Sequence, residues 1–222
     1  MFLLLYLSFS LVVLPILAPI FGRTSLPLWG NLKPLNFGTC LLNRHYVTPQ
    51  LKSQMENLGD EMSNMFPGTK TNYLDANFPF FDGFPLLPHL SHNDGKKLDL
   101  AFYYIDGTTG NPSSSAPSVI GYGVYEDPRV GEVNTAEVCR QGGYWQYELI
   151  GKIVPQWKKE KFNIDETRTS ALIKLLAESE VTSKVFIEPH LKSRWGLSAY
   201  NKSRFHGCHA VRHDDHIHTQ VN

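Results

Sequence analysis

The segments SHNDGKKLD, residues 91–99, and HDDHIH, residues 213–218, decide how this sequence is interpreted. The first holds His92 and Asp99 seven positions apart, and the second ends in His-x-His. His92, Asp99 and His218 together supply two imidazoles and a carboxylate, the ligand set of a catalytic Zn²⁺ that keeps a fourth position open for water. The two segments therefore predict one metal site built from distant parts of the chain.

Strands are predicted around both segments. His216–Val221 and Leu98–Ile105 are rich in β-favouring and apolar residues. Because side chains alternate along a strand, His216 and His218 are expected on the same face of a sheet. Asp99 stands near the start of the other strand, so that a sheet could bring the ligands together.

Helices and further strands are predicted along the rest of the chain. Apolar spacing predicts helices at Gln50–Phe66, Trp145–Trp157, Thr167–Glu180 and Leu191–Leu197. Extended segments are predicted at Asn72–Phe81, Val119–Tyr125 and Lys184–Ile187, with a surface excursion at Glu126–Arg140. This mixture of ligand-bearing strands and intervening helices predicts an α+β fold.

The N-terminal segment is the clearest departure from an average composition. Phe2–Gly22 is a run of 21 residues without charge, and a helix rising ~1.5 Å per residue over this length reaches roughly the 30 Å of a bilayer core. The charged start and the small-residue cleavage site of a signal peptide are missing. The pattern favours an anchor at residues 1–22 over a cleaved signal, followed by a connector at 23–49 and a domain at 50–222.

Composition limits the other functions. The 222 residues, 42% hydrophobic with zero formal net charge, suit one domain and give no footprint for nucleic acid. Three cysteines are too few for a disulfide framework or a Cys-ligated zinc. If one pair bridges, Cys139–Cys208 is the expected pair, because Cys40 lies near the apolar segment. Three buried thiols are the alternative.

Each motif has a simpler interpretation as well. Five of the nine histidines fall within residues 206–218, and a solvated His-rich tail without metal would have the same composition. Tyr144, Trp145 and Trp157 are expected in the core rather than in a substrate platform. Asp94 and Asp214 are expected to be solvated loop carboxylates.

The pattern His89-x-x-His92-x6-Asp99, followed by His213-x-x-His216-x-His218, resembles the penicillin-insensitive murein endopeptidases. These belong to a wider group of metallopeptidases with D-Ala-D-Ala peptidases, lysostaphin-type enzymes and the hedgehog domain. The stretch VTSKVFIEP, residues 181–189, is similar to a strand between the family's two motifs. The resemblance covers about residues 70–222 and implies a hedgehog/DD-peptidase-like antiparallel sheet with flanking helices.

The resemblance also implies roles for single residues. In the family, the positions matching His92, Asp99 and His218 bind zinc, and the position matching His216 assists catalysis. His89 and His213 match further histidines near the site. The family often has Asn where Glu188 stands, and a longer segment with Trp where residues 204–209 stand.

The implied chemistry is hydrolysis of an amide bond by water that zinc activates. This reaction needs a group that accepts a proton and passes it to the leaving amine. His216 is the first choice, and Asp215, three residues before His218, is either the rival base or a partner that orients an imidazole. His213 is expected to donate to the substrate carbonyl or oxyanion.

The resemblance therefore implies a zinc-dependent murein endopeptidase whose partners are peptidoglycan peptides and, through its N-terminal segment, the membrane. A D-Ala-D-Ala carboxypeptidase or dipeptidase, and a non-catalytic zinc-stabilised binding module of the same fold, are the alternatives. A periplasmic or other extracytoplasmic location is expected from the substrate. Arg23, Lys33 and Arg44 follow the apolar segment, and by the positive-inside rule they favour a cytoplasmic C-terminal domain. Both orientations remain open at this point.

Overall fold

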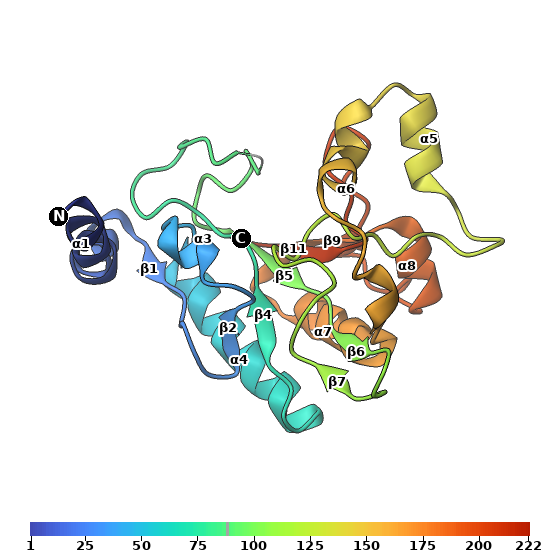
Figure 1. The fold of residues 1–222 in the computed structure, drawn as a ribbon, viewed down its shortest axis with the longest axis horizontal. Helices are drawn as coiled ribbons and strands as arrows, with labels where there is room; N and C mark the ends of the chain where they lie inside the picture. The colour runs from blue at the N-terminus through green and yellow to red at the C-terminus, as the bar shows by residue number, and fades with distance from the viewer. Residues whose placement is uncertain (88) are drawn as a thin grey trace.

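A computed structural model describes residues 1–87 and 89–222 and has a mixed α/β architecture with several sheets (Figure 1). The central sheet has the order β10 (Ser203–Arg204), β9 (Thr182–Phe186), β11 (His216–Val221), β5 (Lys97–Ala101), β4 (Thr71–Tyr73) and β2 (Leu32–Pro34). Its middle strands are antiparallel. The edge pairs β10–β9 and β2–β4 are parallel, so the expectation of an antiparallel sheet was wrong at both edges.

Two helices cover one side of this sheet, as Figure 1 shows for α4 (Pro49–Met65) and α7 (Glu166–Glu178). Thr48 caps α4 by accepting from the Leu51 N–H at 3.4 Å, and Asp165 caps α7 by accepting from the Arg168 N–H at 2.9 Å. Both predicted helices are confirmed. Their apolar faces join the strands in one core that includes Met55, Leu172, Leu100 and Ile217.

Alternation along β5 and β11 separates this core from the candidate site. Leu98, Leu100 and Ile217 are fully buried in the core shared with α4 and α7. Asp99, His216 and His218 alternate with these residues and belong to the opposite face, where Asp99 stands directly across from His218 in the strand register. The predicted strand at His216–Val221 is confirmed, and one face of the sheet is therefore available for chemistry.

The predicted strand at Leu98–Ile105 is divided. It forms β5 and then β6 (Tyr104–Asp106), which joins a second sheet with β7 (Pro112–Ser113) and β8 (Phe162–Ile164). The chain leaves the first sheet because the Tyr103 N–H donates to Thr169 Oγ1, 3.1 Å away on α7, instead of to a neighbouring strand. This partner is remote in sequence, and a local pattern cannot reveal it.

Other segments differ from expectation as well. The predicted strand at Val119–Tyr125 is a loop, because Gly121 and Gly123 have φ of +83° and +82°, outside the β region. The extended segment predicted at Asn72–Phe81 is shorter as a strand, because β4 (Thr71–Tyr73) ends at Tyr73. The helix predicted at Trp145–Trp157 is η3 (Trp145–Glu148) with α6 (Leu149–Ile153), and the predicted helix at Leu191–Leu197 is α8 (Pro189–Arg194). The excursion at Glu126–Arg140 includes the start of α5 (Thr135–Gln141).

The segment expected as a connector is part of the domain. Residues 23–49 contain β1 (Thr24–Ser25), α3 (Gly38–Leu41) and β3 (Tyr46–Val47) in addition to β2. Because β2 pairs with β4 along Leu32–Thr71, Lys33–Asn72 and Pro34–Tyr73, it extends the central sheet. The boundary predicted at residue 50 therefore cuts through a packed unit.

The N-terminal residues form one helical rod. It runs through α1 (Phe2–Ser8), a π-helical segment η1 (Phe9–Val13), α2 (Leu14–Leu17) and a 3₁₀ turn η2 (Ala18–Phe21). The π-helical segment directly precedes α2, which contains Pro15, and proline removes a helix hydrogen bond and crowds the preceding turn. The most apolar 18-residue stretch of Phe2–Phe21 has a mean hydropathy of 2.4, and 17% of that stretch is buried. By length and composition it could be a membrane anchor or a signal sequence.

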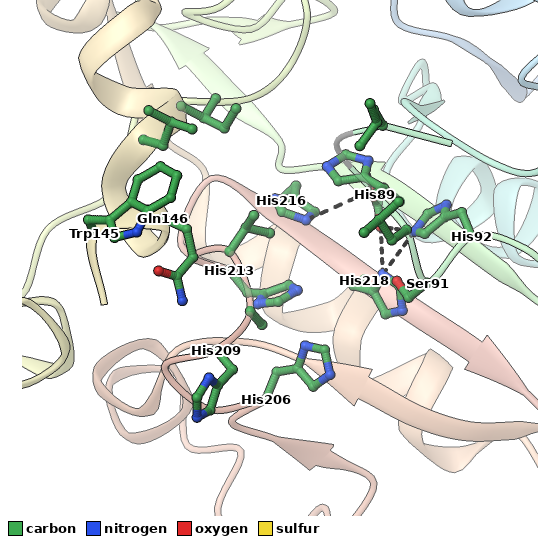
Figure 2. Close-up of a pocket in the computed structure, with 17 residues that line it drawn as sticks. His89, Ser91, His92, Trp145, Gln146, His206, His209, His213, His216 and His218 are labelled. Carbon is green, nitrogen blue, oxygen red and sulfur yellow. Dashed lines mark hydrogen bonds and ion pairs between the residues drawn. The ribbon is translucent and has the colours of Figure 1, made fainter. Parts of the chain in front are cut away.

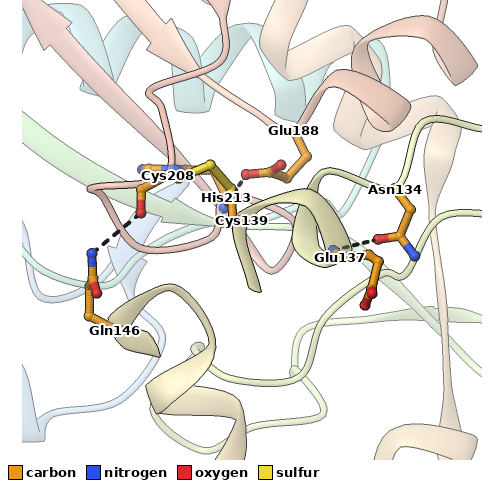
Figure 3. The surroundings of a disulfide bond; sticks show 7 residues. All are labelled: Asn134, Glu137, Cys139, Gln146, Glu188, Cys208 and His213. Carbon is orange, nitrogen blue, oxygen red and sulfur yellow. Dashed lines mark hydrogen bonds between the residues drawn. A yellow bond between two sulfur atoms is a disulfide. The ribbon is translucent and has the colours of Figure 1, made fainter. Parts of the chain in front are cut away.

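A disulfide joins Cys139 in α5 to Cys208, with Cα atoms 5.3 Å apart (Figure 3). This is the pair expected from the sequence. Cys40 remains a buried thiol beside the Tyr73 hydroxyl. The bridge spans 69 positions and fastens the α5–α6 excursion to the loop before β11.

His45, buried beside Tyr46, should make folding sensitive to acid. Burial lowers the pKa of His45 to about 4, below the ~6.5 of an unfolded chain. The unfolded state therefore binds more protons between these values, and stability falls as the pH drops from about 6.5 towards 4. Between about pH 7 and 4.5 the protein loses part of its free energy of unfolding. We expect His45→Leu to make this loss smaller by roughly 2–3 kcal/mol, measured by denaturant unfolding at both pH values. Equal losses in both proteins would contradict this.

Candidate metal centre

A cavity of about 530 Å³ opens on the polar face of the central sheet. Figure 2 shows histidines from three parts of the chain directed into it. His89 and His92 come from the loop before β5, His216 and His218 come from β11, and the loop before β11 contributes the rest. Asp99 on β5 also lines the cavity. Its histidines are His89, His92, His206, His209, His213, His216 and His218.

The three ligands predicted from the sequence lie together at its floor. His218 Nδ1 is 2.8 Å from Asp99 Oδ1, His92 Nε2 is 3.3 Å from the same oxygen, and the two nitrogens are 3.2 Å apart. In a tetrahedral site with bonds of 2.0–2.1 Å, ligand atoms lie about 3.3 Å from one another. The three donor atoms therefore have the spacing that one small divalent ion requires.

A second set of donors overlaps this one. His89, His92 and Asp99 have possible ligand atoms within 4.8 Å of one another, and this buried group could bind a metal ion. The Nδ1 of His89 is already hydrogen-bonded to Asp75 at 2.8 Å, and Asp75 is paired with Arg44. His92 and Asp99 belong to both sets, and His218 Nδ1 lies closer to the Asp99 carboxylate, at 2.8 Å, than His89 Nδ1 does, at 3.4 Å.

The protonation state of His92 suits a metal ligand. Its Nδ1 lies 2.9 Å from the Ala76 carbonyl oxygen. A carbonyl can only accept, so Nδ1 carries a proton, and in the neutral ring the lone pair is on Nε2, which faces Asp99 and His218. Such a bond from the second ring nitrogen commonly fixes the tautomer of a metal-binding imidazole. Burial acts to lower the pKa of His92, but the Asp99 charge raises it above its usual value, so a metal ion at Nε2 would take the place of a proton there.

Asp99 and His218 have complementary electrostatics. Burial acts to raise the pKa of Asp99, but the charges of His92 and His216 and the hydrogen bond from His218 hold it well below its usual value. Burial also lowers the pKa of His218 to about 4, although Asp99 opposes this. An ionised carboxylate and a neutral imidazole are the forms that bind metal ions.

His216 forms a pair with its neighbour Asp215 beside these donors. Its Nδ1 is hydrogen-bonded to Asp215 Oδ1, and Asp215 Oδ2 accepts from the Gly123 N–H at 2.5 Å. The other ring nitrogen, Nε2, lies 3.9 Å from Asp99 Oδ2. Burial acts to lower the pKa of His216, but Asp215 and Asp99 raise it above its usual value. His216 is thus oriented with Nε2 towards the donors and is suited to accept a proton.

The other residues before β11 have different surroundings. The His213 ring lies 5.0 Å from that of His216 between centroids, and burial together with the His216 charge holds the pKa of His213 well below normal. Asp214 was expected to be solvated, which is wrong. It is fully buried and paired with Arg212. His206 stacks on Phe186 at 4.1 Å.

Tyr122 belongs to the site, although the sequence analysis did not select it. Its hydroxyl donates to Asp99 Oδ2 at 2.8 Å, and its ring lies 4.8 Å from both His89 and His216. Burial and the Asp99 charge raise the pKa of Tyr122 well above normal, so it remains a donor. Tyr122 thereby orients the carboxylate that the two donor sets share. The flanking Gly121 and Gly123 were the available signal, because such glycines mark a loop.

Replacing Tyr122 by Phe should weaken metal binding while preserving the fold. The variant removes the hydroxyl that orients Asp99 but keeps the ring between the two imidazoles. Loss of such an outer partner typically costs about 10–100-fold in metal affinity. Competition with a chromophoric chelator would measure the change. An unchanged metal affinity would show that Asp99 does not need this bond.

One expectation for the aromatic residues was wrong. Trp145 and Trp157 were predicted in the core, but their exposed fractions are 70% and 68%. Trp145 lines the cavity at its mouth, together with Gln146, Leu149 and Ile150. Gln146 and Trp145 face the histidines in Figure 2. The cavity thus has an imidazole-rich side and an apolar side.

In comparisons with known proteins, no family model matches this chain and no curated protein matches it. The functional argument therefore depends on the arrangement of the side chains and on the motif pattern described above. Both concern the same residues, since the motif histidines at positions 89, 92, 213, 216 and 218 all line one cavity with Asp99.

Proposed function

We propose that this protein is a zinc-dependent peptidase that hydrolyses amide bonds in peptidoglycan peptides, as a murein endopeptidase. The observation that carries the proposal is the close approach of His92 Nε2, Asp99 Oδ1 and His218 Nδ1, with mutual distances of 2.8 to 3.3 Å. Two imidazoles and one carboxylate suit zinc among the common divalent ions. The motif resemblance supports the choice of substrate.

The donor set fits a catalytic rather than a structural ion. Three protein ligands leave a position open, whereas structural zinc sites are normally closed by four. When bound, zinc supplies a polarised substrate carbonyl and a water of lowered pKa. His92, Asp99 and His218 would hold the ion, and Tyr122 keeps Asp99 in position through its hydroxyl.

The protein's own residues would manage the proton. His216 Nε2 faces the donors and can accept a proton from water, while Asp215 stabilises the resulting imidazolium. The same ring can then return the proton to the leaving amine. Asp215 is occupied by His216 and the Gly123 N–H, which favours an orienting role over that of a base. His213, held neutral by burial, can donate to the substrate oxygen.

The charge of the cavity favours an internal bond over a terminal one. A carboxypeptidase must hold the terminal carboxylate of its substrate, which a cation normally does. Among the described residues, none that lines the cavity is Lys or Arg. Arg44 is nearby in the adjoining pocket but is paired with Asp75. An endopeptidase substrate has no such carboxylate at the cleaved bond, and it fits this neutral surface better than a D-Ala-D-Ala terminus does.

The proposed substrate lies outside the cytoplasmic membrane, and two features support that location for the domain. Phe2–Phe21 could hold the protein at the membrane or direct its export. The Cys139–Cys208 disulfide is of a kind that persists in oxidising compartments and is rare in the cytosol. We therefore propose an extracytoplasmic domain, in spite of the basic residues that follow the apolar helix.

Digestion of cell-wall sacculi tests the proposal. The full chain in detergent, loaded with Zn²⁺, should open peptide cross-links in purified sacculi, and mass spectrometry would identify the released fragments. A chelator should stop the release, and added Zn²⁺ should restore it. Loss of a single terminal residue without opening of cross-links would indicate a carboxypeptidase instead. Equal release in the presence of chelator would refute a metal-dependent peptidase.

A further inference from the structure

The apolar side of the cavity is formed by one short helical region. Trp145 begins η3, and Leu149 and Ile150 begin α6. Although η3 is a 3₁₀ turn and the three residues do not share one ideal helical face, all three side chains line the cavity. Figure 2 shows Trp145 on the side opposite His216 and His218. We call these three residues the apolar wall.

This wall is attached firmly to the loop that carries the histidines. The Cys139–Cys208 bridge joins α5, just before the wall, to the segment between His206 and His209 (Figure 3). Gln146 Nε2 also donates to the Cys208 carbonyl at 3.5 Å. On the far side of the wall, the Gly151 N–H donates to the Tyr125 hydroxyl at 3.1 Å. The width of the cavity between the wall and the histidines is therefore constrained.

The exposure of the wall indicates that something covers it. Trp145 is 70% exposed and Leu149 is 36% exposed at the mouth of a cavity of about 530 Å³. Large apolar side chains gathered on a concave surface commonly mark a ligand site. Among the described lining residues there is no Lys or Arg, and the carboxylate present, Asp99, is engaged by His218 and Tyr122. The occupant should therefore be apolar and uncharged where it meets the wall.

We propose that Trp145, Leu149 and Ile150 form a subsite that binds an uncharged apolar side chain of a peptide, next to the bond facing His92, Asp99 and His218. This inference rests on the proposed function and adds a substrate preference to it. The wall excludes charged side chains, because burying a charge against apolar groups without a partner is costly. The disulfide positions the wall, so its removal should weaken peptide binding without affecting the metal ligands.

The chain offers a matched control for Trp145. Trp157 is almost equally exposed, at 68%, and follows α6 in sequence. Its ring lies under the ammonium groups of Lys158 and Lys161, at 4.9 and 5.6 Å, and it does not belong to the described cavity lining. Trp157→Ala therefore removes an exposed indole of the same size outside the proposed subsite.

Peptide binding by the metal-free protein separates this inference from the proposed function. The full chain in detergent with chelator would be titrated calorimetrically with end-blocked alanine hexapeptides that carry Leu, Lys or Glu at one central position. We expect the Leu peptide to bind at least about tenfold more tightly than the others. Trp145→Ala and Leu149→Ala should each lose about this factor, whereas Trp157→Ala should not.

Three results would overturn the subsite. These are equal affinity for the three peptides, an unchanged affinity after Trp145→Ala, and binding of an N-acetylglucosamine oligosaccharide in place of the peptides. A separate experiment, the chelator-sensitive digestion of sacculi, tests the proposed function. Selective peptide binding without such digestion would leave the subsite established and refute the peptidase. The Cys139→Ser/Cys208→Ser variant should lose peptide affinity but keep its metal content, and an unchanged peptide affinity would refute the positioning role of the bridge.

Discussion

Replacing Asp99 by Ala should abolish metal binding by this protein. Asp99 is the carboxylate that the two possible donor sets share, and its Oδ1 lies within 3.3 Å of both His92 and His218. The loss should exceed the ~10–100-fold that removal of an outer partner costs. Zinc content after dialysis, measured by elemental mass spectrometry, should fall from about one ion per chain to near zero. Circular dichroism would verify that the variant folds.

One control and two further variants make this result specific. Asp94→Ala removes a carboxylate on the same approach to β5, but one that is paired with Lys97 outside the cavity, and it should retain metal. His218→Ala and His89→Ala then distinguish the overlapping donor sets. Because His218 lies closer to Asp99 than His89 does, the loss of His218 should remove the metal, whereas His89→Ala should leave it bound. A full complement of zinc in Asp99→Ala would end the case for this centre.

Replacing His216 by Ala should abolish turnover and leave the metal in place. His216 directs Nε2 towards the donors but lies 3.9 Å from Asp99 Oδ2, farther than the three proposed ligands lie from one another. General acid–base groups typically contribute about 10²–10⁴-fold, so we expect kcat to fall by roughly 10³-fold. Release of muropeptides from sacculi would measure activity, and zinc content would be measured on the same sample.

Asp215→Asn is the diagnostic companion of this variant. Asp215 bonds His216 Nδ1, so its amide should disturb the tautomer of the imidazole and lower kcat, with no loss of metal. If Asp215→Asn abolishes turnover while His216→Ala retains it, Asp215 is the base and His216 is not. Loss of zinc from His216→Ala would instead make His216 a ligand.

The elements predicted well are those whose signals are local. Helix α7 has an apolar face and an Asp165 cap within a few residues, and α4 begins at Pro49, directly after its cap Thr48, and ends before Pro-Gly. Strand β11 was predicted at its observed bounds, because alternation with period two is visible along six residues. The elements missed depend on remote contacts, such as the bond from Tyr103 to Thr169 that separates β5 from β6.

For the candidate site, the amino-acid pattern alone identified His92, Asp99, His216 and His218 as residues to bring together, because ligand chemistry and strand alternation are local properties. The antiparallel pairing that sets His218 opposite Asp99 exists only in the folded chain. The same is true of the Tyr122 hydroxyl on Asp99, the Gly123 N–H on Asp215, and the apolar wall across the cavity. These contacts join segments far apart in sequence, and burial rather than spacing decides which partners meet.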